Sequence, residues 1–319
     1  MTELKNKRIY KVISLFIKLV ILILSLLYIW NKLHNVSLVM DDFPDLFSGG
    51  NMKYILLIFL LMFVNWGLEA CKWKLLISPL EIITFSASLK AVFAGVTISI
   101  FTPNRMGEFA ARVFFLERSN KIKASLMSLI GSLMQLVVTI VFGVLAYCLL
   151  EHTHTGYFQT KQLISANAVF LLLIVLLTIT LFIFFMRMNK FPKLKKYIDV
   201  FKIYSKKELS FIFFMSLARY IVFSIQYYFA LKIFGINGEI IILLSLIAVT
   251  FFITSVIPTF ALTEIAVRTG VAIYCFGVIC SAHASIAASS LFLWLINLGV
   301  PALIGSFFVW KLKFFKEQK

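Results

Sequence analysis

Two short stretches of the chain carry the same charged pattern. In each, a proline is followed five or six residues later by a glutamate, and an arginine comes four residues after the glutamate. The members are Pro103, Glu108 and Arg112 in the first copy and Pro258, Glu264 and Arg268 in the second. Glutamate and arginine four residues apart lie on one face of a helix, in the order that favours an ion pair. The chemistry such a pair offers is charge neutralisation or, through its arginine, contact with an anion.

Each proline also marks the start of a short helix. Such a helix begins with unpaired N–H groups and the positive end of the helix dipole, which favour an anionic group such as a lipid phosphate. Thr102 or Asn104 can cap the first of these helices. The predicted breaks are Pro103, Asn104, Gly107 and Pro258. The predicted contacts to an anionic headgroup come from Arg105, Glu108, Arg112, Arg219, Glu264 and Arg268.

Each of these charged residues also has a purely structural interpretation. The two glutamate–arginine pairs can neutralise themselves and only make their segments insertable in a membrane. Arg219 lies about ten residues into an apolar run, roughly 15 Å deep in a helix. It is either the partner of a carboxylate such as Glu108 or Glu264, or a contact for the headgroup. The amides expected to bridge helices instead are Asn65, Gln135 and Asn297.

Catalysis and metal binding are not expected. The polar residues of the apolar segments are mainly glutamate and arginine, without a nucleophile and a base. His152 and His154 are two residues apart, which does not match the same-face spacing of a helical metal pair. No glycine-rich loop ends in Gly-Lys-Ser/Thr, so no ATP site is predicted. We therefore predict no catalytic residue, no metal site and no cofactor.

The composition places these residues in a membrane. Hydrophobic residues make up 61% of the 319 positions, charged residues 14%, and the mean hydropathy is +0.97. A soluble domain is about half apolar and about a quarter charged. The net charge of +17 is gathered in basic clusters between apolar runs, which suits anionic lipid headgroups. The predicted partners are therefore membrane lipids and not nucleic acid, and a homo-oligomer is compatible with the sequence.

Eight long apolar runs divide the chain, and backbone polar groups in lipid are satisfied only if each run is helical. The runs lie at 12–30, 54–70, 84–101, 124–150, 164–186, 209–233, 240–257 and 284–310. Two of them, 84–101 and 240–257, each stop at a proline and are followed by a shorter stretch that contains charges. The predicted fold class is an all-α polytopic membrane protein, in a single domain over residues 1–319.

The basic residues of the connections predict the orientation. Both termini and segment 187–208 are basic, so the N- and C-termini are predicted to be cytoplasmic, in the cytoplasmic (inner) membrane. Residues 71–82, which include Lys72, and residues 118–123 also indicate the cytoplasmic side, yet one apolar run separates them. One transmembrane helix would place these two segments on opposite sides of the membrane. We therefore predict six full transmembrane helices and two oppositely oriented re-entrant hairpins. They form a predicted inverted repeat, a common transporter arrangement, with units at about 84–150 and 240–310.

These motifs resemble those of a known family, the transmembrane region of lysylphosphatidylglycerol synthases, also called the flippase-like domain. The resemblance rests on residues 102–108 with Arg112, and on residues 258–264. Family members usually have glycine where Asn104 stands, and asparagine tolerates the same left-handed backbone. The glycines usual between the second proline and its glutamate are replaced here by Phe260, Ala261 and Leu262.

The resemblance implies translocation of lipids between leaflets. In the family the synthase that charges the lipid is a separate cytosolic domain, whereas this chain ends at Lys319, nine residues after the last run. We therefore expect no aminoacyl transfer and no enzyme activity. The leading hypothesis is a flippase or transporter for an anionic phospholipid or a lipid-linked envelope precursor. The alternatives are a non-transporting membrane subunit that anchors an envelope-lipid or glycosyltransferase enzyme, and a membrane-embedded transferase.

Overall fold

All regular secondary structure that the computed structural model describes is helical, as predicted. It describes residues 49–102, 105–117, 120–153, 203–257 and 261–310. The helices are α2 (Gly49–Ile77), α3 (Phe85–Ser99), α4 (Gly107–Arg112), α5 (Lys121–Thr153), α8 (Lys206–Ile233), α9 (Ile240–Val256), α10 (Ala261–Phe276), α11 (His283–Trp294) and α12 (Val300–Trp310). A 3₁₀ turn, η3 (Val113–Phe115), follows α4, and a π-helical turn, η5 (Leu295–Gly299), joins α11 to α12.

Four helices in the described part of the chain are long and apolar enough to cross a membrane. They are α2, α5, α8 and the continuous helix formed by α11, η5 and α12. The predicted spans at 12–30 and 164–186 lie outside the described residues. The predicted loop at 71–82 is wrong over its first seven residues, because α2 continues to Ile77 and carries Lys72 inside it. This basic residue is tolerated in the helix because Glu69, one turn earlier, pairs with it.

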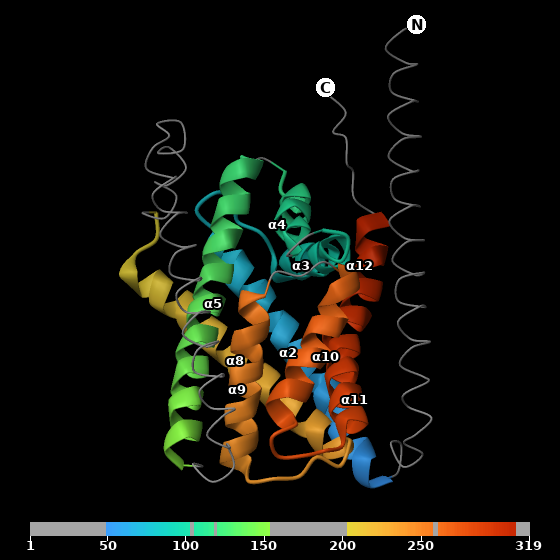
Figure 1. The fold of residues 1–319 in the computed structure, drawn as a ribbon. Helices are drawn as coiled ribbons and strands as arrows, with labels where there is room; N and C mark the ends of the chain where they lie inside the picture. Colours follow the sequence, from blue (N-terminus) through green and yellow to red (C-terminus); the bar gives the residue numbers. More distant parts are fainter. Residues whose placement is uncertain (1–48, 103–104, 118–119, 154–202, 258–260, 311–319) are drawn as a thin grey trace, which may run out of the picture.

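Two pairs of shorter helices form hairpins between the long helices. Figure 1 shows the α3–α4 hairpin at the upper end of the bundle, whereas α9 and α10 meet the rest of the chain at the lower end. The helices of each hairpin pack against each other. The break residues Pro103, Asn104 and Pro258 lie outside the described residues. After the first break the sequence predicts one short helix over residues 104–117, but the α-helix ends at Arg112 and the backbone becomes extended at Leu116.

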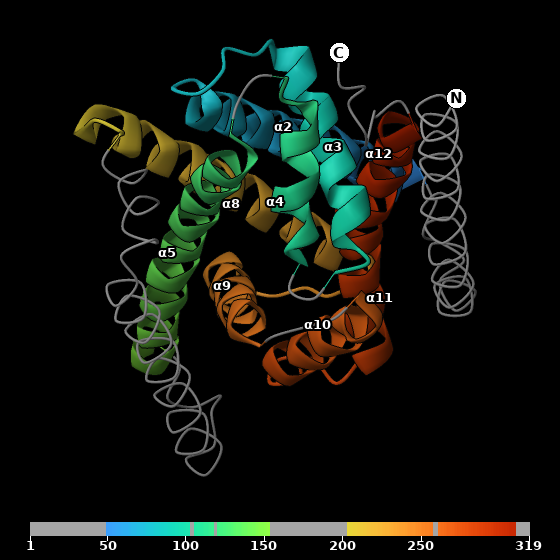
Figure 2. The same cartoon turned by 90° about the horizontal axis from the view of Figure 1, so that it is seen from above.

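Each hairpin rests on a long helix from the other half of the chain. Helix α3 packs on α12, and α9 packs on α5. Helices α2 and α8 pack against each other. Seen from above, α5 and α12 lie on opposite sides of the bundle (Figure 2). Thr97 on α3 donates to the Ala302 carbonyl of α12 at 2.7 Å. Each hairpin thus packs on a long helix of the other predicted repeat unit, as expected for two related units. The inverted repeat itself stays a prediction.

Both of these crossings depend on a glycine. A Cβ on Gly305 of α12 would collide with the Phe93 carbonyl and the Thr97 hydroxyl of α3. A Cβ on Gly143 of α5 would collide with the Phe252 side chain of α9. Small residues at such positions allow helices in lipid to approach closely, where packing drives their association.

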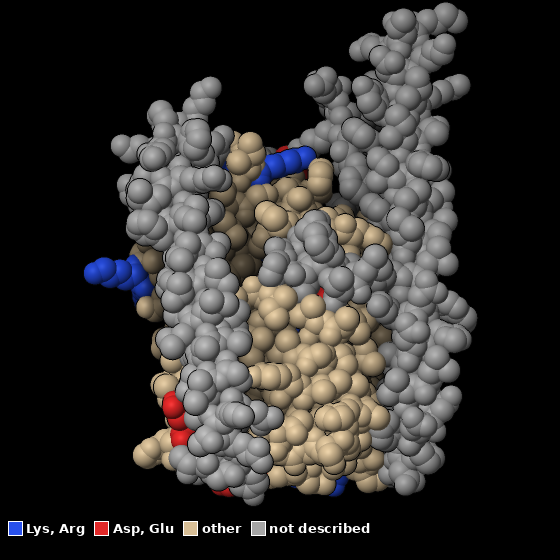
Figure 3. Space-filling view, viewed as in Figure 1, with Lys and Arg blue, Asp and Glu red and all other residues tan. Residues whose placement is uncertain are grey.

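The outer surface is suited to lipid. Among the described residues visible in Figure 3, those in the middle of the face are almost entirely uncharged, and the few charged side chains lie near its margins. Large apolar side chains point outward in stripes, such as Leu56, Leu60 and Phe63 on one side of α2. Exposed apolar side chains at this density are expected where the solvent is hydrocarbon. The structure therefore places a polar site inside the bundle and apolar residues around it.

Candidate functional site

A single buried carboxylate on α2 joins three cations. Glu69 Oε2 lies 2.8 Å from Lys72 Nζ and also pairs with Arg219 Nη1, while Glu69 Oε1 accepts from Arg112 Nη1 at 2.8 Å. Lys72 donates further to the Gly131 carbonyl of α5 at 3.3 Å. Glu69 thus joins α2 to α4 and α8, and its partner Lys72 extends the link to α5. We call the residues Glu69, Lys72, Glu108, Arg112 and Arg219 the buried network.

The first predicted glutamate–arginine pair belongs to this network. Arg112 Nη2 pairs with Glu108 Oε1, as its spacing predicted. Arg112 is buried between Glu108 and Glu69. The spacing of four residues in the sequence is therefore sufficient to predict this ion pair. Packing directs the pair toward α2 and away from the polar pocket described below.

The second pair faces that pocket. Arg268 Nε and Nη2 both lie 3.0 Å from Glu264 Oε1. Glu264 is buried, whereas the Arg268 side chain is 32% exposed. The second arginine is therefore held by one carboxylate and is more accessible than the first.

The pocket has a volume of about 250 Å³ and is lined from α2, α5, α8, α9, α10 and the last long helix, with Arg105. Its charged residues are Arg105, Arg219, Glu264 and Arg268. Its other polar residues are Asn65, Gln135, Thr139, Thr254, Ser255 and Asn297, and its aromatic residues are Trp66, Tyr220, Phe223, Phe251 and Trp294. Four of the six predicted headgroup contacts line the pocket, and Glu108 and Arg112 do not.

Arg219 connects the buried network to the pocket. Its Nε donates to Asn65 Oδ1 at 2.9 Å, and its guanidinium carbon lies 5.6 Å from the centre of the Trp66 ring. Arg219 therefore does pair with a carboxylate, but the carboxylate is Glu69. Asn65 also donates to Asn297 Oδ1 at 3.5 Å, so this predicted helix bridge is confirmed.

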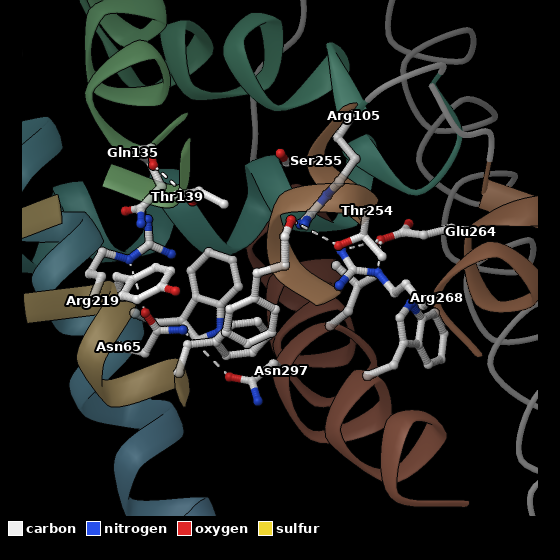
Figure 4. A pocket seen from close by; sticks show the side chains of 16 residues that line it. Asn65, Arg105, Gln135, Thr139, Arg219, Thr254, Ser255, Glu264, Arg268 and Asn297 are labelled. Atoms are coloured by element: carbon white, nitrogen blue, oxygen red, sulfur yellow. Dashed lines mark hydrogen bonds and ion pairs between the residues drawn. The ribbon is translucent and has the colours of Figure 1, made fainter. Parts of the chain in front are cut away.

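The two sides of the pocket carry separate groups of charge. Figure 4 shows Arg219 and Asn65 on one side and Glu264 and Arg268 on the other, with the Arg105 side chain reaching between them toward Thr254. Arg219 stands 13 residues after Lys206 and 14 before Ile233, which is roughly 20 Å from each end of α8. The pocket is therefore near the middle of the bundle.

Arg105 sits at the first hairpin break in a strained backbone. Its φ of 58° lies in the left-handed region, which non-glycine residues adopt rarely. Its Nε donates to Ser99 Oγ at 3.4 Å, and its buried Nη2 has no hydrogen-bond partner among the described residues. The predicted cap at Thr102 is wrong in position, because the N-cap residue of α4 is Met106, whose side chain makes no cap hydrogen bond. The Thr102 hydroxyl nevertheless accepts from Gly107 N, in the first turn of α4, at 2.8 Å. Since α4 has only six residues, side-chain cations contribute more to the positive potential than its helix dipole.

Several site residues were missed from the sequence. Glu69 and Lys72 carry a visible signal, since two opposite charges three residues apart interrupt an apolar stretch. Thr139, Thr254 and Ser255 carry none, because isolated hydroxyl residues in apolar helices commonly bond their own backbone, as these threonines and Ser255 also do.

The all-helical fold, the apolar outer surface and the charged pocket inside define a multi-pass membrane protein. A model of the family described as lysylphosphatidylglycerol synthase TM region matches residues 15–305, and the chain belongs to this family. Membership gives the protein a lipid-related role in the membrane. No curated protein and no solved structure matches the chain.

Proposed function

We propose that the protein moves an anionic phospholipid or a lipid-linked envelope precursor between the two leaflets, and that the headgroup passes through the pocket. The observation that supports this most is the lining of the pocket, which has three arginines and one glutamate near the middle of the bundle. Intramembrane charges usually face an interior cavity and mark the path of a substrate. An excess of arginine favours an anion in particular.

The pocket can replace the charge pairing and hydrogen bonds that a headgroup loses when it leaves water. A charged group in the hydrocarbon core is costly unless it is paired and hydrogen-bonded. The guanidinium groups of Arg105, Arg219 and Arg268 can pair with a phosphate, and the amides and hydroxyls of the lining can bond its remaining polar groups. The acyl or prenyl chain would stay on the apolar outer surface.

Transport in liposomes tests this proposal. The purified protein is reconstituted and exchange of a short-chain fluorescent anionic phospholipid is followed by extraction with albumin. We expect Arg105→Gln to slow exchange about tenfold, the scale of one charge-assisted hydrogen bond. Among the described residues this arginine forms no ion pair, so its removal should leave no carboxylate unpaired. Lys90→Gln, which removes an exposed charge on α3, should leave the rate unchanged.

One result would reject transport. If wild-type protein exchanged the lipid no faster than protein-free liposomes, the flippase proposal would fail. Co-purification of a lipid-modifying enzyme or glycosyltransferase in fixed ratio, without lipid exchange, would favour the non-transporting subunit instead.

A further inference from the structure

The charges of the buried network and the pocket do not balance. Together these two groups contain five cations and three carboxylates in the described part of the chain. The cations are Lys72, Arg105, Arg112, Arg219 and Arg268, and the carboxylates are Glu69, Glu108 and Glu264. The groups are continuous, because Arg219 belongs to both. With all of them ionised, two positive charges have no counter-charge.

The excess charge faces the pocket. Lys72 and Arg112 are enclosed, with side chains 1% and 2% exposed, whereas those of Arg219 and Arg268 are 17% and 32% exposed. Arg105 reaches the pocket from the first hairpin break and has a buried Nη2 without a hydrogen-bond partner among the described residues. Trp66 also lines the pocket, and its buried Nε1 has no partner among the described residues. The pocket therefore offers donors and positive charge that are not satisfied within the protein.

We propose that the transported headgroup ends in a phosphomonoester, which carries about two negative charges, rather than in a phosphodiester, which carries one. A phosphomonoester has a charge of about −1.5 to −2 at pH 7 and three strong acceptor oxygens. It would neutralise both excess charges, whereas a diester would leave one cation uncompensated at membrane depth, where an unpaired charge is costly. This inference rests on the proposed function. The ligand class is a lipid monophosphate, with a diacylglycerol or a polyprenyl anchor.

A comparison of two lipids that differ only in the headgroup tests the inference. Short-chain fluorescent phosphatidic acid and phosphatidylglycerol with the same acyl chains are followed by albumin extraction at pH 7.5. We expect phosphatidic acid to exchange about tenfold faster, the scale of one additional charge pair. At pH 5.5 the second phosphate proton returns, since its pKa is about 6. The preference should then fall several-fold, while the charge of phosphatidylglycerol is unchanged.

Two variants separate net charge from the identity of a side chain. Arg105→Gln removes one of the two excess charges, so the preference for phosphatidic acid should fall to about twofold or less. The double variant Glu264→Gln/Arg268→Gln removes one charge of each sign and should keep the preference, even if both rates decrease. Lys90→Gln serves as the matched control outside the pocket and should keep both the rates and the preference.

Competition identifies the source of the phosphate. Unlabelled polyprenyl monophosphate should slow the exchange of fluorescent phosphatidic acid, and the same concentration of inorganic phosphate should not. Equal competition by inorganic phosphate would show that the site takes free phosphate and would overturn the assignment to a lipid. Equal exchange of the two fluorescent lipids would overturn the phosphomonoester but leave the proposed function standing. Exchange of neither lipid above the protein-free rate would reject the proposed function itself.

Discussion

Glu69 is the residue on which most of the buried charge depends. Its two carboxylate oxygens serve Lys72, Arg112 and Arg219, which come from three helices. A buried charge that keeps its partners is tolerated, but one that loses them is strongly destabilising. Glu69 therefore holds the first hairpin in place through Arg112 and positions the Arg219 side chain in the pocket.

Replacing Glu69 by glutamine should destabilise the protein. The neutral amide leaves Lys72, Arg112 and Arg219 with only Glu108 as a counter-charge, and we expect a loss of about 3–5 kcal/mol in the free energy of unfolding. The measurement is unfolding by SDS titration in mixed micelles. Glu239→Gln, at an exposed position where the side chain makes no cap hydrogen bond, should change stability by less than about 0.5 kcal/mol. Equal effects of the two variants would contradict the network.

At this scale, sequence reasoning succeeded where the interaction was local. The pairs Glu108–Arg112 and Glu264–Arg268 follow from helical spacing alone, and both form. The pairing of Glu69 with Arg219, 150 residues away, depends on how α2 meets α8. Helical spacing is a property of the local chain, but contacts between helices depend on packing, which a single sequence does not reveal.

At the scale of elements, the hairpins are held by close helix crossings. The two hairpins could be predicted because charge bias and crossing number disagree for simple spans. Their partners could not, since the sequence gives no reason for α3 to choose α12 over another apolar helix. Gly305, which lies against the backbone of α3, is the clearest local determinant of that choice.

Replacing Gly305 by alanine should open the α3–α12 contact. The new methyl group would meet a backbone carbonyl, which cannot move aside as a side chain can. We expect a destabilisation of about 1–3 kcal/mol, measured as above. Gly67→Ala on α2, where a Cβ would meet no atom within 4 Å, should be neutral or stabilising because alanine favours a helix. A Gly305→Ala protein as stable as wild type would show that the crossing is looser.

At the scale of the whole molecule, the connections before α3 and after α10 lie at opposite ends of the bundle (Figure 1). Ser78 is exposed between α2 and α3, and Ser281 is exposed between α10 and α11. The bias of basic residues predicts that the end with Ser78 is cytoplasmic. Cysteine differs little from serine in size, so replacing these two serines by cysteine allows the side of the membrane on which each connection lies to be measured.

Thiol labelling should show the two connections on opposite sides of the membrane. The four native cysteines, Cys71, Cys148, Cys275 and Cys280, are free and are first replaced by alanine. In sealed, oriented vesicles, we expect a membrane-impermeant maleimide to label Ser78→Cys only from the cytoplasmic side and Ser281→Cys only from the other side. Labelling of both from one side would rule out the opposite placement.

The seating of α3 on α12 also determines when this protein can finish folding. The hydrogen bond from Thr97 to Ala302 joins residues 205 positions apart. At a synthesis rate of about 5–20 residues per second, the ribosome needs roughly 10–40 s to travel that distance. Throughout this interval the nascent first hairpin, with its charged pair, must wait in or near the insertion machinery without its final partner. Slow elongation after α3 would prolong this exposure to quality-control proteases. Mutations in α12 that weaken the contact would leave α3, which is synthesised much earlier, without its packing partner.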